Sequence, residues 1–305
     1  MLSTGHPQTD NRWWEVTVTC LPELEDIVYW HFEQLGGKGT VSQRHGETRL
    51  VSAYLLEAQF QPSDFESFQS QLANNALESG LPAPFQVTWQ LIDEEDWAKS
   101  WKVHWKPEEV GDRLLINPAW MAPPETLRTV LTLDPGSAFG TGTHATTQLC
   151  LKALEQQPAD GLTLADIGCG SGILSIAALL YGAQQVYAAD VDPLATKATR
   201  DNANLNGIVP EQLKISLGSV GDIIAIAEGP VDGIVCNILA EIIVAMILPR
   251  LGELARPSTW CILSGILTSK ADWVEEHLIA HGWQVNSQIH QDEWCAMTVT
   301  LAPAA

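Results

Sequence analysis

The sequence predicts two domains: an α/β domain built on a mixed sheet with an antiparallel final hairpin, and before it a small α+β domain. Three observations support this prediction. An apolar strand, a glycine-rich loop, a helix and a second strand follow one another between Leu164 and Asp190, as in a βαβ unit. Upstream, residues 12–92 show elements in the order βαββαβ. The length of 305 residues corresponds to about two domains.

Composition and charge exclude several classes of protein. The hydrophobic content of 46% is sufficient for a buried core, so we do not expect a disordered chain. The net charge of −21 argues against a large phosphate-binding surface and suits a basic partner, although solubility explains it equally well. The six cysteines form no Cys-x-x-Cys pair, and we predict no metal. The N-terminus resembles no secretory signal peptide, and no apolar run could span a bilayer, so we expect a cytoplasmic protein.

Residues 12–92 predict a ferredoxin-like domain. The expected elements, in order, are strand Trp13–Cys20, a helix from Pro22 to Gly36-Gly37, strands over 40–44 and 49–56, a second helix, and strand Gln86–Ile92. The second helix is predicted by a capping box of Ser63 and Glu66, followed by an apolar stripe of Phe65, Phe68, Leu72 and Ala76. His31 and His45 stand alone, which favours surface or core positions over ligand roles. This domain carries no catalytic constellation, so we interpret it as a substrate-recognition module or a brace.

Residues 93–125 predict a connector between the two domains. Asp93 caps a helix that runs to Trp105 and ends before Pro107. Trp97, Trp101 and Trp105 recur every four residues, which places them on one helix face, packed on a neighbouring domain or forming a binding surface. A strand over 113–118 leads out of this connector.

The third segment, residues 126–305, begins with a glycine-rich stretch over 133–147 that precedes a helix over 145–154. It lacks the Gly-Lys-Ser/Thr of a Walker A loop, and we expect it to fold over a ligand. Within it, His144 is a candidate base, but we favour a role in ordering the loop.

The βαβ unit predicts a cofactor site. Gly168, Gly170 and Gly172 follow a strand at alternate positions, and a turn of this kind leaves unpaired N–H groups that a ligand can approach. Asp190 ends the next strand, where its carboxylate can accept hydrogen bonds from both hydroxyls of a ribose. Ile173 replaces the third glycine of the dinucleotide fingerprint. Together with Asp166, the pattern resembles the first motif of class I methyltransferases, which bind S-adenosylmethionine; the alternative is a turn without a ligand.

The remaining elements complete the sheet. Asp192 and Pro193 begin a helix that ends at Asn206-Gly207. The further elements are strands Leu213–Leu217, 233–236 and 259–264, a helix over 272–281, and a final pair over 283–289 and Trp294–Leu301. Asn237 follows the strand over 233–236 and therefore projects to the same sheet edge as Gly168 and Asp190, unless it only caps the next helix.

Five stretches together resemble the PrmA family of bacterial methyltransferases, namely DPGSAFGTGTHATT, DIGCGSGIL, DVDP…NANLNG, NIL and LSGIL. The resemblance covers nearly the whole chain and implies a Rossmann-like, seven-stranded mixed sheet. It also implies methylation of lysine ε-amines and of the N-terminal α-amine of large-subunit ribosomal protein eleven, which the small domain docks. By position, Thr147, Gly168, Asp190 and Asn237 resemble the family's cofactor contacts, and Phe139, Thr141 and His144 lie in the matching loop. Ala145 stands where many relatives have proline.

The expected chemistry needs no dedicated base, because desolvation favours the neutral amine and the proton can escape to water. Asn237 and a backbone carbonyl would accept amine N–H bonds and aim the lone pair, so we expect Asn237 to be catalytic. We expect a monomer without direct nucleic-acid binding. Two alternatives remain: a methyltransferase of a nucleobase amine or small molecule, and a non-catalytic ribosome-assembly factor.

Overall fold

The computed structural model describes residues 12–36, 38–78, 84–92, 105–134, 140 and 142–302. The chain divides into two compact units, Met1–Trp105 and Lys106–Ala305. Residues 106–125, which the sequence analysis assigned to the connector, therefore lie in the second unit. The expected connector helix lies outside the described residues except for Trp105.

The first unit contains a four-stranded antiparallel sheet. Its strands are β1 (Trp13–Cys20), β2 (Lys38–His45), β3 (Thr48–Leu56) and β4 (Gln86–Ile92), in the spatial order β2-β3-β1-β4. Two helices, α1 (Glu25–Gln34) and α2 (Pro62–Glu78), pack on one face of this sheet through a shared core that includes Val16, Val51 and Phe68. Short 3₁₀ turns, Pro22–Leu24 and Glu57–Gln59, precede these helices. The ferredoxin-like arrangement is confirmed.

Two local features of this unit could be established only from the structure, namely the start of α2 and the environment of His31. The predicted capping box at Ser63 is wrong: α2 begins at Pro62, and the Asp64 carboxylate accepts the Gln61 N–H at 2.8 Å. Proline at the first helical position moves the start upstream, because its fixed φ suits the first turn. His31 is buried, with its Nε2 3.1 Å from Asn75 Nδ2, so it is a satisfied core histidine.

The second unit contains the predicted seven-stranded mixed sheet, in the order β10-β9-β8-β11-β12-β14-β13. Its strands are β8 (Thr163–Ile167), β9 (Gln185–Asp190), β10 (Leu213–Leu217), β11 (Val231–Asn237), β12 (Ala255–Leu267), β13 (Trp283–Gln291) and β14 (Trp294–Leu301). Neighbouring strands from β10 to β12 are parallel, whereas β14 is antiparallel to both β12 and β13. The final hairpin is therefore confirmed.

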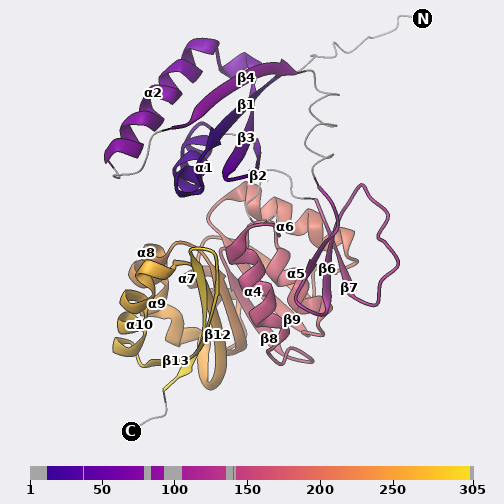
Figure 1. Cartoon of the computed structure of the whole chain (residues 1–305). Helices are drawn as coiled ribbons and strands as arrows, with labels where there is room; N and C mark the ends of the chain where they lie inside the picture. Colours follow the sequence, from indigo (N-terminus) through magenta and orange to yellow (C-terminus); the bar gives the residue numbers. More distant parts are fainter. Residues whose placement is uncertain are drawn as a thin grey trace, which may run out of the picture. The chain divides into compact units, whose positions relative to one another are not determined.

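Helices cover both faces of this sheet (Figure 1). One face carries α4 (Ala145–Glu155), α5 (Ile173–Leu180) and α6 (Pro193–Leu205); the other carries α7 (Val220–Ile226), α8 (Ala240–Ile242), α9 (Leu248–Leu251) and α10 (Ala271–Ala280). A π-helical turn, Ile243–Ile247, joins α8 to α9, and 3₁₀ turns Gly252–Leu254 and Thr268–Lys270 flank β12. Within β12, Ile262 packs on the first face and Cys261 on the second, as the alternation of a strand requires.

A smaller sheet precedes the large one in the second unit. It contains β5 (Glu108–Val110), β6 (Leu114–Pro118) and β7 (Thr129–Leu133). The sequence analysis predicted β6 but neither of its neighbours.

No described helix combines the length and the apolar character that crossing a membrane would require.

Candidate active site

The loop between β8 and α5 depends on its three glycines. Gly168, Gly170 and Gly172 have φ values of +78°, +54° and +83°, a region that other residues adopt only with strain. Space is restricted as well: a Cβ on Gly168 would lie 2.5 Å from Ile238 Cγ2, and one on Gly172 would lie 2.8 Å from Thr199 Cγ2. The alternate spacing therefore reflects both backbone conformation and close packing.

The hydrogen bonding of the backbone N–H groups in this loop differs from the expectation. The N–H groups of Gly168 and Cys169 both donate to Ala189 O, at 2.8 and 3.1 Å, and the Gly172 N–H donates to Cys169 O at 2.7 Å. The prediction that the turn leaves these groups unpaired is wrong, because the end of β9 provides the acceptor for Gly168 and Cys169 and the loop itself provides the acceptor for Gly172. The glycines serve close approach rather than a set of free donors.

Asp190 is the last residue of β9, and its carboxylate joins two backbone segments. Its Oδ2 accepts the Gly170 N–H at 2.9 Å, and its Oδ1 accepts the Asp192 N–H at 3.0 Å. Each carboxylate oxygen can accept more than one hydrogen bond, so these contacts leave capacity for a ligand. Asp192 caps α6 through Leu194 N at 2.8 Å, as predicted.

Asn237 is the last residue of β11. Its Nδ2 donates to Thr147 Oγ1 at 3.4 Å, and Thr147 is fully buried in the first turn of α4. The Oδ1 of Asn237 is buried and has no hydrogen-bond partner among the described residues. Leu239, not Asn237, is the N-cap of α8, so the capping alternative is wrong. A buried acceptor without a partner is costly, which marks this atom as a candidate to meet a ligand donor.

These residues form one continuous group at the carboxyl edge of the sheet. Strands β9, β8 and β11 are neighbours, so Asp190, the glycine loop and Asn237 follow one another along that edge. Ile238 packs against Gly168, and its carbonyl oxygen lies against Gly265, where a Cβ would approach it to 2.2 Å. The structure therefore gathers Thr147, Gly168, Gly170, Gly172, Asp190 and Asn237.

The glycine-rich stretch upstream is described only in part. Phe139 and Thr141 lie outside the described residues. His144 is the N-cap of α4, where its Nδ1 accepts the Thr146 N–H at 3.3 Å, and its ring lies 5.4 Å from that of Trp294. Burial lowers the pKa of His144 to about 4, so the imidazole is neutral at pH 7. This arrangement suits a loop-ordering role.

Asp166 is a buried residue of this region that we did not assign to the site. It is fully buried in β8, and its Oδ2 accepts the Ser175 hydroxyl at 2.6 Å and the Ser175 N–H at 3.1 Å. Its Oδ1 has no partner among the described residues. Burial raises the pKa of Asp166 to about 7 against the two bonds from Ser175, which lower it. The acidic residue before the glycines was visible in the sequence, but its burial was not.

The raised pKa of Asp166 predicts a pH-dependent stability. The unfolded carboxyl ionises near pH 3.8, whereas the folded one retains its proton to about pH 7. Between these values the folded state binds more protons, so stability falls as pH rises, by about 2 kcal/mol between pH 5.5 and 8. We expect Asp166→Asn to lose this component in urea unfolding at the two pH values. Asp112→Asn, at an exposed position, is the matched control, and equal pH dependence of wild type and Asp166→Asn would contradict the assignment.

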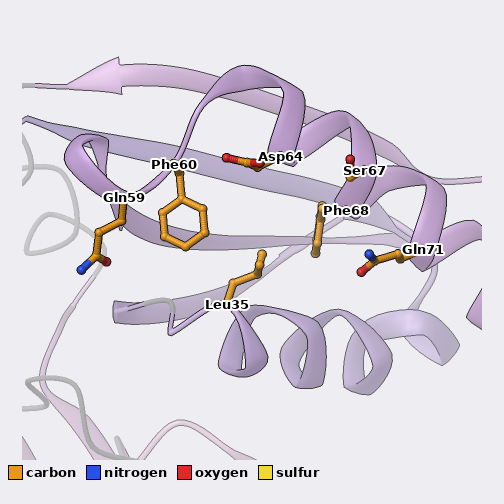
Figure 2. Close-up of a pocket in the computed structure, with 7 residues that line it drawn as sticks. All are labelled: Leu35, Gln59, Phe60, Asp64, Ser67, Phe68 and Gln71. Carbon is orange, nitrogen blue, oxygen red and sulfur yellow. The ribbon is translucent and has the colours of Figure 1, made fainter.

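A groove of about 290 Å³ lies in the first unit (Figure 2). Rings of Phe60 and Phe68 and the side chain of Leu35 face it between α1 and α2. The other lining residues are polar: Gln59, Asp64, Ser67 and Gln71. None of the predicted site residues lines this groove.

Among the described residues, no group of three or more His, Cys, Asp or Glu side chains could bind a metal ion.

Comparison with known proteins gives concordant matches. A model of the family "Ribosomal protein L11 methyltransferase (PrmA)" matches residues 12–302. Curated proteins named ribosomal protein L11 methyltransferase match from Synechococcus elongatus, at 45% identity over 95% of this chain and 97% of the relative, and from Thermosynechococcus vestitus, at 46% over 94% and 96%. The crystal structure of a ribosomal protein L11 methylase from Lactobacillus delbrueckii subsp. bulgaricus matches with a TM-score of 0.60 and 32% identity, covering 65% of this chain and 100% of that one.

The sheet order, the antiparallel β14 and the glycine loop agree with these matches and confirm the class I methyltransferase fold. The resemblance found in the motifs is confirmed over nearly the whole length. The chain belongs to the family of ribosomal protein L11 methyltransferases.

Proposed function

We propose that this protein uses S-adenosylmethionine to methylate lysine ε-amines and the N-terminal α-amine of ribosomal protein L11. The observation that carries the proposal is the buried Oδ1 of Asn237, which has no partner among the described residues and stands at the carboxyl end of β11. An incoming amine has N–H groups to donate to such an acceptor. The relatives named for methylation of this ribosomal protein support the choice of substrate.

The residues present fit S-adenosylmethionine, whose sulfonium supplies an electrophilic methyl group when bound. The carboxylate of Asp190 can accept hydrogen bonds from ribose hydroxyls, as its position after β9 suits. Gly168 and Gly172 keep the loop free of side chains where packing is closest.

Positioning is the main contribution of the protein in this proposal. The Asn237 Oδ1 would accept an N–H of the amine and aim its lone pair, while Thr147 Oγ1 fixes the orientation of the amide through Nδ2. A lysine ammonium, with a pKa of about 10.4, must first lose its proton. With a pKa of about 4, His144 is too weak a base for this role. Desolvation of the amine favours its neutral form, so proton loss to water suffices.

The first unit would recognise the protein substrate. It has its own core, and residues 12–92 contain ten acidic and four basic side chains. A protein that binds ribosomal RNA presents positive charge, which this acidic surface complements. We place the reaction in the cytoplasm, where ribosomal proteins are available, and expect a monomer.

The test is transfer of labelled methyl groups to ribosomal proteins. Ribosomal proteins and RNA from cells lacking this enzyme are incubated with it and labelled S-adenosylmethionine, then separated. We expect label in a single protein, and intact-mass measurement should show gains in multiples of one methyl group. Label in RNA would instead identify a nucleobase methyltransferase, and absence of label would indicate a non-catalytic assembly factor.

A further inference from the structure

Two asparagines, Asn202 in α6 and Asn206 as its C-cap, pair with the backbone of β7 and of the residue that follows it. The Oδ1 of Asn206 accepts the Thr132 N–H at 2.8 Å, and its Nδ2 donates to Thr132 O at 2.7 Å. One turn earlier, the Oδ1 of Asn202 accepts the Asp134 N–H at 2.8 Å, and its Nδ2 donates to Asp134 O at 3.1 Å. The two carboxamides thus act on β7 as a neighbouring strand would, satisfying its backbone groups.

Asn202 makes a further bond that Asn206 does not. Its Nδ2 also donates to Ser171 O at 2.9 Å, inside the glycine loop. Asn202 is 1% exposed, so water cannot replace these bonds. The orientation of its amide is determined, because one atom must accept from an N–H and the other must donate to two carbonyls. Asn202 therefore connects the glycine loop to the start of the stretch over 134–147.

Other contacts reinforce this connection. The Ser171 hydroxyl donates to Gly140 O at 2.6 Å, which ties the glycine loop to the same stretch a second time. The Thr199 hydroxyl, on the same helix as Asn202, donates to Gly170 O at 2.9 Å. The stretch over 134–147 ends at Thr147, which bonds Asn237. One face of α6 therefore holds the glycine loop, and through Asn202 it also holds Asp134.

We propose that Asn202 is a positioning residue for methyl transfer, acting through the glycine loop, which it ties to the backbone of Asp134. The inference rests on the proposed function for its reaction, but its effect on ligand binding can be measured without a methyl acceptor. Among the described residues, the Asn202 carboxamide bonds backbone groups only, and it sets how far Ser171 stands from Asp134. Loss of this link shifts the glycine loop relative to Thr147 and Asn237.

The test uses Asn202→Asp in the full chain, with S-adenosylhomocysteine as the probe ligand. The substitution keeps the Oδ1 acceptor but places an oxygen opposite the carbonyls of Asp134 and Ser171, so two bonds become repulsive contacts. Asn204→Asp is the matched control, since Asn204 is exposed on the same helix and the charge change is identical. We expect the Kd for S-adenosylhomocysteine, from calorimetry, to rise at least tenfold in Asn202→Asp and less than twofold in Asn204→Asp.

Asn206→Asp separates positioning from stability. It keeps the Oδ1 acceptor for the Thr132 N–H but loses the Nδ2 bonds to Thr132 O and Asn202 O, none of which involves the glycine loop. We therefore expect a fall in Tm similar to that of Asn202→Asp but less than a threefold change in Kd. In steady state, Asn202→Asp should raise KM for S-adenosylmethionine and lower kcat, while KM for the protein substrate stays unchanged. If Asn202→Asp does not fold, Asn202→Ser replaces it in every measurement.

Two results would overturn the inference: equal Kd values for Asn202→Asp and Asn204→Asp, or a rise in Asn206→Asp as large as in Asn202→Asp. The second would show that general packing of α6 on β7 accounts for the effect. A wild-type enzyme that binds S-adenosylhomocysteine but transfers no methyl group to ribosomal proteins would refute the proposed function, while the binding comparison would still decide the role of Asn202.

Discussion

Asn237→Ala is expected to lower kcat about 100-fold, the scale on which misplacement of a reacting group acts. The variant loses the buried Oδ1 that would aim the amine lone pair, and it also releases Thr147 Oγ1 from its contact with Nδ2. The measurement is a single-turnover rate with saturating S-adenosylmethionine and ribosomal protein L11.

The control for this experiment is Asn204→Ala, which removes the same side chain at an exposed position of α6. It should leave the rate at the wild-type value. A rate for Asn237→Ala close to that of the control would reject the assignment of Asn237 as the catalytic residue.

Asp190→Ala is expected to weaken binding of S-adenosylhomocysteine about 100-fold, since hydrogen bonds to a charged acceptor contribute about 1.5–3 kcal/mol. Two effects combine: the carboxylate no longer accepts from ribose hydroxyls, and Gly170 N–H loses its acceptor. Calorimetry measures the change in Kd directly.

An analogue of S-adenosylhomocysteine without the two ribose hydroxyls separates these effects. If Asp190 accepts from the ribose, the substitution should weaken binding of this analogue far less than binding of the parent ligand. Equal weakening for both ligands would mean that Asp190 acts only by ordering the glycine loop.

The strands of this fold were predictable because their alternation of apolar and polar residues is a local property. Trp13–Cys20 and Leu213–Leu217 have the predicted bounds. By contrast, β5 has three residues, and the backbone of Thr132 in β7 pairs with Asn206, which is distant in sequence, so no local pattern specified these strands. The start of α2 was misplaced because Ser63 and Glu66 match a capping box, whereas the helix begins at Pro62 and Asp64 accepts the Gln61 N–H.

The location of the site was predictable for a topological reason. Parallel strands place their carboxyl ends at one sheet edge, so Gly168, Asp190 and Asn237 had to gather once the strands were recognised. The functional assignment depended on motifs whose spacing can be read directly from the sequence. Bonding within the loop was not predictable: the acceptors of Gly168 and Gly170 lie on β9, about twenty residues downstream.

The sequence by itself determined the strands of the two larger sheets, the glycine positions and the family, because each depends on residues close together in the chain. Only the tertiary structure decided which acceptors are buried without a partner, why the pKa of Asp166 rises to about 7, and how Asn202 ties together Asp134 and Ser171. The physical reason is that desolvation and hydrogen-bond geometry depend on neighbours in space, which the order of residues alone does not specify.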